Sequence, residues 1–151
     1  MKKIITKCAD ETVRFGARLG KLISKGDIIA LNGNLGSGKT TLVKGIAQGL
    51  GVRDARYVNS PSFVIVKEYK GRFPLYHFDV YRLDDPSALD SVGYKEFFYG
   101  NGASVIEWAE KIQELLPKEH LSIEFFSEDI NKREISISAE GERYKKMVAR
   151  L

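Results

Sequence analysis

The fold class is predicted mainly from residues 28–41, which read Ile28-Ile29-Ala30-Leu31-Asn32-Gly33-Asn34-Leu35-Gly36-Ser37-Gly38-Lys39-Thr40-Thr41. It opens with apolar residues that do not alternate with polar ones, which predicts a strand buried on both faces of a sheet. Residues 33–40 then satisfy the pattern G-x-x-x-x-G-K-[ST]. A helix is predicted to follow over residues 41–48 and to stop at Gly49-Leu50-Gly51. A strand, a glycine-rich loop and a helix in this order predict a loop that binds phosphate.

Each residue type in this loop suits a nucleoside triphosphate. The glycines permit unusual backbone dihedrals and close approach, so that several backbone N–H groups can point at the phosphates. The helix that begins near Lys39 adds the positive end of its dipole. We expect the Lys39 ammonium to lie between the β- and γ-phosphates, the Thr40 hydroxyl to bind Mg²⁺ and Thr41 to meet the α-phosphate.

A site for Mg²⁺ and a nucleotide also needs a carboxylate at the end of a neighbouring strand. Asp79 follows the predicted strand 75–78, and Glu107 follows the predicted strand 103–106. Because ligands of open α/β sheets gather at the carboxyl ends of the strands, we expect both acids to converge on the loop. The alternative interpretation of Asp79 is a residue that forms a turn at a strand end.

Three nearby features each admit two interpretations. Ser60-Pro61-Ser62-Phe63 is either a loop that closes on the γ-phosphate and metal or a plain proline turn. His77, inside a strand, is a packed core histidine more often than a catalyst. Tyr81-Arg82 either brings an arginine toward phosphate or forms a surface salt bridge.

The rest of the chain predicts strands interleaved with helices and no linker, so residues 1–151 are interpreted as a single domain. The predicted fold class is α/β, a P-loop NTPase-like three-layer sandwich with a mixed, largely parallel central sheet and antiparallel hairpins. The further predicted elements are an edge strand at 2–7, a helix from near Asp10 to Gly26, hairpins pairing 63–69 with 75–78 and 121–126 with 134–139, and helices at 86–98 (broken at Gly93), 108–116 and from Glu142.

Composition excludes several classes of protein. The 151 residues are 43% apolar and 29% charged, which is typical of a folded globular chain. No apolar run is long enough for a membrane span, and residues 1–7 lack the apolar core of a secretion signal. The only cysteine, Cys8, cannot form an internal disulfide, which fits the cytoplasm. A net charge of +4 indicates either a solvated surface with a slight lysine excess or a weak basic patch.

Taken together, the motifs resemble those of the bacterial TsaE family, P-loop ATPases of tRNA threonylcarbamoyladenosine biosynthesis. The resemblance covers about residues 10–110, and its most specific parts are residues 76–83, Tyr-His-Phe-Asp-Val-Tyr-Arg-Leu, and Ile106-Glu107-Trp108. Two positions depart from the family's usual pattern: Ser62 stands where Thr is usual and Ala109 where Pro is common. The first change keeps a hydroxyl, and the second affects only how a helix begins.

The resemblance implies ATP and Mg²⁺ as cofactors and a TsaD–TsaB-type transferase complex as partner, with tRNA met indirectly through that complex. It implies that the segment around Ala9 lies against the base, and that Asp79 supports the metal or orients water. The site residues expected are Lys39, Asp79 and Glu107 in catalysis; Ala9, Gly33, Gly36, Ser37, Gly38, Lys39, Thr40, Thr41 and Ser62 in nucleotide binding; and Thr40, Glu107 and Asp79 at the metal.

Three other functions fit the loop less well or overlap with this one. A GTPase would need Asn-Lys-x-Asp, whereas residues 131–134 read Asn-Lys-Arg-Glu inside a predicted hairpin. A small P-loop kinase would need a lid that carries arginine, and the chain has no arginine between Arg82 and Arg133. A nucleotide-gated interaction module, whose shape changes when ATP binds, stays open as the main alternative.

Overall fold

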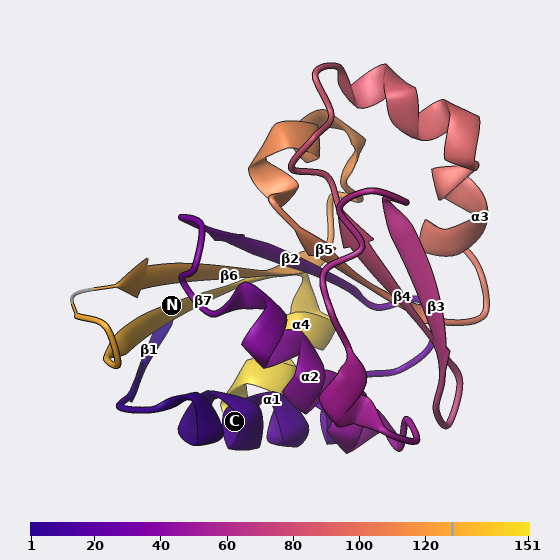
Figure 1. Ribbon diagram of the computed structural model, residues 1–151. Coiled ribbons are helices and arrows are strands. Elements are labelled where there is room, and N and C mark those ends of the chain that lie inside the picture. Colours follow the sequence, from indigo (N-terminus) through magenta and orange to yellow (C-terminus); the bar gives the residue numbers. More distant parts are fainter. Residues whose placement is uncertain (128) are drawn as a thin grey trace.

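The computed structural model describes residues 1–127 and 129–151, and its centre is a seven-stranded sheet with the order β1-β7-β6-β2-β5-β4-β3 (Figure 1). The strands are β1 (Lys2–Thr6), β2 (Ile28–Gly33), β3 (Val66–Lys70), β4 (Pro74–Asp79), β5 (Ala103–Glu107), β6 (His120–Ser127) and β7 (Arg133–Glu140). The helices are α1 (Ala9–Leu22), α2 (Lys39–Leu50), α3 (Tyr94–Phe98) and α4 (Glu142–Ala149), and the 3₁₀ helices are η1 (Ala55–Tyr57), η2 (Pro86–Val92) and η3 (Ala109–Leu115).

The sheet is parallel in the middle and antiparallel toward both edges, as the sequence predicted. Strand β2 lies parallel to β5 and β6, and β5 lies parallel to β4. The hairpins β3–β4 and β6–β7 and the edge strand β1 are antiparallel additions. The apolar run at the start of β2 is buried on both faces because helices cover both sides of this strand.

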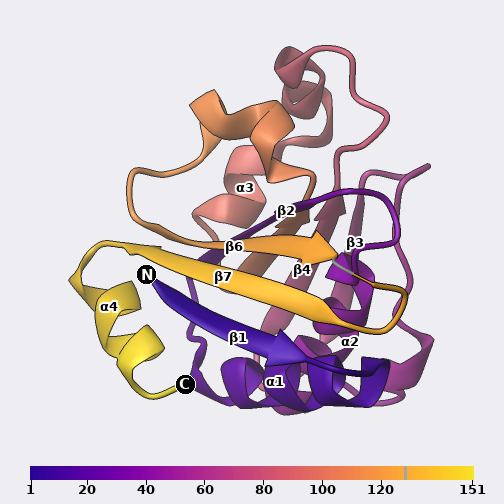
Figure 2. The ribbon, with the colours of Figure 1, turned by 90° about the vertical axis from the view of Figure 1, so that its left-hand side faces the viewer.

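Two helical layers enclose the sheet, which completes the predicted three-layer α/β sandwich (Figures 1 and 2). Helices α1, α2 and α4 cover one face and share a large apolar core with it. The other face is covered by η2, α3 and η3, which pack through a smaller, aromatic-rich core. The carboxyl ends of the parallel strands lie at the same end of the sheet, so the segments that follow β2, β4 and β5 meet there.

Helices α1 and α2 approach so closely that only glycines fit between them. A Cβ added at Gly45 would stand 2.2 Å from the backbone oxygen of Val13, and one at Gly20 would stand 2.2 Å from that of Ile46. The close contact places the first turn of α1 beside the first turn of α2, which begins at the phosphate loop. This packing therefore brings the N-terminal segment of the chain to the predicted site.

Three local predictions were wrong in extent or kind. Helix α1 ends at Leu22 instead of Gly26, since Ile23 is already extended. Residues 63–65 precede β3 instead of belonging to it, and Ile65 has a left-handed φ of 70°. The segment predicted as a helix over 108–116 is the kinked 3₁₀ helix η3, because Trp108 leaves β5 with a left-handed φ of 62°. Within the described residues, no helix has the length and apolarity needed to cross a bilayer.

Candidate nucleotide-binding site

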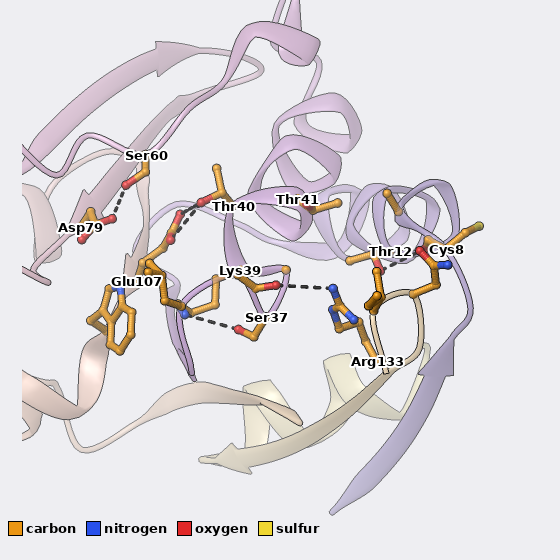
Figure 3. Close-up of a pocket in the computed structure, with 17 residues that line it drawn as sticks. Cys8, Thr12, Ser37, Lys39, Thr40, Thr41, Ser60, Asp79, Glu107 and Arg133 are labelled. Atoms are coloured by element: carbon orange, nitrogen blue, oxygen red, sulfur yellow. Dashed lines mark hydrogen bonds between the residues drawn. The ribbon is translucent and has the colours of Figure 1, made fainter. Parts of the chain in front are cut away.

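A cavity of about 300 Å³ opens at the carboxyl ends of β2, β4 and β5 (Figure 3). The register pairs Leu31 with Glu107 and Asp79 with Glu107, so the two acids end neighbouring parallel strands beside the loop that follows β2. The cavity is lined by Cys8, Ala9, Thr12, residues 35–41, Ser60, Asp79, Glu107, Trp108, Ile130, Asn131 and Arg133. Most residues expected from the sequence are thus in one place; Gly33 and Ser62, among the described residues, do not line the cavity.

The loop between β2 and α2 wraps one end of this cavity. Gly38 precedes the helix with a φ of 108°, a left-handed conformation that side chains other than glycine's rarely adopt. Helix α2 then starts at Lys39, with its first turn lining the cavity. The backbone N–H groups of a helix's first turn lack intrahelical partners and carry partial positive charge. This end of the cavity is therefore suited to an anion.

Lys39 is largely buried and lies along the loop. Its ammonium donates to the backbone oxygens of Gly33 at 2.5 Å and Asn34 at 2.9 Å, and it lies 4.0 Å from the centre of the Trp108 ring. Burial lowers the pKa of Lys39 from its usual value, and the nearby negative charge of Glu107 partly opposes that shift. A polyphosphate in the cavity would favour the charged ammonium in the same way.

The carboxylate of Glu107 is held between two side chains from different elements. The Thr40 hydroxyl donates to it, 2.8 Å from Oε1 and 3.0 Å from Oε2. Nε2 of His77 also lies 2.8 Å from Oε1. Glu107 is 3% exposed, so these contacts replace most of the water that the carboxylate would otherwise bind. The predicted partners Thr40 and Glu107 are in direct contact.

Asp79 is held by the loop that precedes β3. The Ser60 hydroxyl donates to Oδ2 of Asp79, and the Tyr81 backbone N–H donates to Oδ1 at 2.9 Å. Ser62 is the residue of this loop that was predicted to bind the nucleotide, but Ser60 is the one that lines the cavity. The left-handed Ile65 also fastens the loop to β4, since its backbone oxygen accepts from the Asp79 N–H at 2.8 Å.

The opposite end of the cavity is built by α1 and by Ile130, Asn131 and Arg133. Ala9 and Thr12 line it from α1. Arg133 reaches it from β7 and donates to the backbone oxygen of Gly36 at 3.4 Å. Arg133 is not among the predicted site residues, because no local pattern in the sequence marks it. Strand β6 runs parallel to β2, so its end, and the turn that follows, arrive beside the loop.

The residues present fit Mg²⁺ bound together with a nucleotide. Within residues 1–127 and 129–151, no cluster of three or more His, Cys, Asp or Glu side chains could hold a metal alone. Magnesium in nucleotide sites needs only one or two protein oxygens, because phosphates and water supply the remaining ligands. Thr40, Glu107 and Asp79 offer such oxygens on one side of the cavity, with Lys39 on the loop beside them.

Comparisons with known proteins agree with this geometry. Residues 6–135 match the model of a family described as threonylcarbamoyl adenosine biosynthesis protein TsaE. The chain is 43% identical over 143 residues to the tRNA threonylcarbamoyladenosine biosynthesis protein TsaE of Bacillus subtilis, covering 94% of this chain and 88% of the relative. It is 37% identical to the protein of that name from Treponema pallidum, covering 90% of this chain and 99% of the relative.

A solved structure shows the same fold. The crystal structure of Bacillus subtilis YdiB matches with a TM-score of 0.81 and 37% sequence identity, covering 98% of this chain and 91% of that one. The match extends well beyond the phosphate loop and includes the C-terminal strands, for which the motifs gave little information.

Proposed function

This chain belongs to the TsaE family, and from that premise we propose that it binds and hydrolyses ATP in support of the threonylcarbamoyladenosine modification of tRNA. One observation carries the proposal: the glycine-rich loop, the Thr40–Glu107 pair and Asp79 line a single cavity at the carboxyl ends of parallel strands. The pathway is proposed from the relatives, which are tRNA threonylcarbamoyladenosine biosynthesis proteins, and the chemistry is proposed from the cavity.

The loop between β2 and α2 and the first turn of α2 would bind the phosphates. Their backbone N–H groups and the Lys39 ammonium can meet a polyphosphate without rearrangement of the core. Ala9, Thr12 and Thr41 lie farther along the same cavity and leave room there for the nucleoside. We propose ATP over GTP because the chain belongs to the TsaE family. The chain also lacks the Asn-Lys-x-Asp motif that would recognise guanine.

Hydrolysis requires that water attack a phosphate whose charge is neutralised. Mg²⁺ bound with the nucleotide would supply that neutralisation, and the oxygens of Thr40 and Glu107 would hold it. Asp79, fixed by Ser60 and the Tyr81 N–H, either binds the metal through water or orients the attacking water. Lys39 adds a positive charge beside the transferred phosphate.

A TsaD–TsaB-type complex is the proposed partner, and tRNA is met through it in the cytoplasm. The apolar side chains of Leu35 and Ile130 line the cavity yet are 78% and 84% exposed, so the mouth of the site is open to a partner's surface. The guanidinium of Arg133 is held by backbone oxygens, including that of Gly36, and this arrangement favours slow turnover until a partner supplies or frees transition-state groups.

The test is the rate of ATP hydrolysis by the purified chain, first alone and then with the TsaD–TsaB complex and tRNA. We expect slow turnover by the chain alone and an increase of tenfold or more with the complex, since groups supplied in trans can raise such rates by roughly 10³ or more. Lys39→Ala is the control for contaminating ATPases. Fast turnover by the chain alone would contradict the proposed dependence on a partner.

A second experiment, on complex binding and tRNA modification by Glu107→Gln, separates the proposal from a nucleotide-gated interaction module, which the exposed apolar mouth also favours. In a module, Glu107→Gln would still bind the complex in the presence of ATP and still support tRNA modification. In the proposed ATPase, that variant would bind the complex but fail to sustain repeated rounds of modification.

A further inference from the structure

His77 is a fully buried histidine in β4 that contacts the candidate site without lining its cavity. Its Nε2 lies 2.8 Å from Oε1 of Glu107, the oxygen to which the Thr40 hydroxyl is also nearest. An ionised carboxylate only accepts hydrogen bonds, so Nε2 carries the proton and donates it. Glu107 thus receives one hydrogen bond from α2 and one from β4.

Packing alone does not explain a histidine at this position. The other ring nitrogen, Nδ1, is buried and has no hydrogen-bond partner among the described residues. Burying a polar atom without a partner lowers stability, a cost that an apolar side chain avoids. Leu75, two residues earlier on the same face of β4, is buried just as completely and is apolar. The imidazole is therefore best explained by what its Nε2 does.

We propose that His77 is a positioning residue that fixes the Glu107 carboxylate toward Thr40, where Mg²⁺ enters with ATP; this inference rests on the proposed function. A glutamate side chain has three rotatable bonds, and a single contact with Thr40 would leave its carboxylate free to turn. The second hydrogen bond, from β4, which is paired with β3 and β5, removes that freedom before the metal arrives. Partners of this kind commonly change metal affinity by about tenfold or more.

The test uses a matched pair of variants, His77→Gln and His77→Met. Glutamine places an amide N–H close to where Nε2 of histidine stands, and methionine has similar length but no donor. The affinity for a non-hydrolysable ATP analogue is measured by calorimetry with EDTA and with saturating Mg²⁺. Electron paramagnetic resonance of Mn²⁺ reports metal binding directly. His120→Gln, at the only other histidine of the chain, is the control.

We expect the gain in affinity that Mg²⁺ confers to fall about tenfold in His77→Met and to stay within twofold of wild type in His77→Gln. With EDTA, both variants should match wild type within about threefold. Equal losses with and without metal, or an unchanged gain in His77→Met, would overturn the positioning role while leaving the proposed function intact. If Mg²⁺ does not change the nucleotide affinity of the wild-type protein, both the positioning role of His77 and the proposed function are overturned.

A measurement on the unmodified protein covers the case in which the methionine variant does not fold. Long-range ¹H–¹⁵N correlation spectra distinguish the two neutral tautomers of histidine, and comparison with His120→Gln assigns the His77 signals. The inference requires the Nε2–H tautomer for His77. Protonation at Nδ1 alone would mean that Glu107 is not held by this ring, and would overturn it.

Discussion

Lys39 and Glu107 lie close together in the site, but we expect their removal to have different effects. Lys39 is the cation of the phosphate loop, so Lys39→Ala should weaken ATP binding by about 100-fold, or about 3 kcal/mol, with or without Mg²⁺. Glu107→Gln should spare binding in EDTA and abolish most Mg²⁺-dependent hydrolysis, because the Glu107 carboxylate contacts the Thr40 hydroxyl, where Mg²⁺ is proposed to bind.

Calorimetry with ATP, with and without Mg²⁺, checks both expectations. Lys44→Ala, on the same helix but outside the cavity, is the matched control for loss of a lysine. Equal losses of affinity in Lys39→Ala and Glu107→Gln under both conditions would contradict separate roles for the two residues.

Single site residues could be predicted where a motif or a strand end marks them. Lys39, Thr40 and Glu107 belong to local patterns, and the structure brings them together. Arg133 carries no such mark, and it reaches the loop only because β6 lies next to β2. The choice of Ser62 over Ser60 illustrates the same limit, since the backbone course of a loop decides which hydroxyl turns inward.

At the scale of elements, the contact between α1 and α2 sets the width of the nucleotide cavity. In Gly45→Ala, the new Cβ would stand 2.2 Å from the backbone oxygen of Val13, so the helices must separate. Overpacking of this kind costs about 1–3 kcal/mol, against which alanine's better helix propensity returns up to about 1 kcal/mol. We expect a net loss of about 1–2 kcal/mol and a fall in melting temperature of about 2–8 °C.

Calorimetric unfolding checks this loss of stability, and ATP binding checks the coupling to the site. Because α1 carries Ala9 and Thr12 on the cavity wall, a shifted α1 should also weaken nucleotide binding by several-fold. Gln48→Ala, at an exposed position of α2, should leave the stability and the nucleotide affinity unchanged. A Gly45→Ala protein as stable as wild type would show that the two helices separate without cost.

The kind and order of the elements could be predicted more reliably than their ends. Every strand of the sheet could be predicted, because β2 and β5 show the apolar runs of strands buried on both faces and the other strands are bounded by turn residues. The end of α1 and the 3₁₀ form of η3 depend on Ile23 and Trp108, whose dihedrals are set by tertiary contacts. The intrinsic helix propensities of these residues predict neither the end of α1 nor the 3₁₀ form of η3.

At the scale of the whole molecule, the sequence predicted a mixed sheet but not the order of its strands. The order places the C-terminal hairpin beside β2, and α4 then fastens that region to the start of β2. Arg143 of α4 pairs with the buried Asp27, and the Ile28 N–H donates to the Tyr144 hydroxyl at 2.8 Å. Burial raises the pKa of Tyr144 to about 12, so this phenol stays neutral at physiological pH. Contacts between residues 116 positions apart leave no local signature.

The cavity draws on segments from the first turn of α1 to the start of β7, so a bound nucleotide should stabilise the molecule as a whole. At a concentration of 100 times Kd, a ligand that binds only the folded state adds about 2.7 kcal/mol, which corresponds to a rise in melting temperature of about 5–10 °C for a chain of this size. A non-hydrolysable ATP analogue should produce that rise in wild type and little of it in Lys39→Ala at the same concentration.

Hydrogen exchange in the presence of the analogue should slow both at residues 8–12 and at residues 129–133, which are distant in sequence but contribute to the same cavity. Slowing confined to residues 33–41 would mean that the phosphates alone are held and that neither α1 nor the β6–β7 turn takes part in binding.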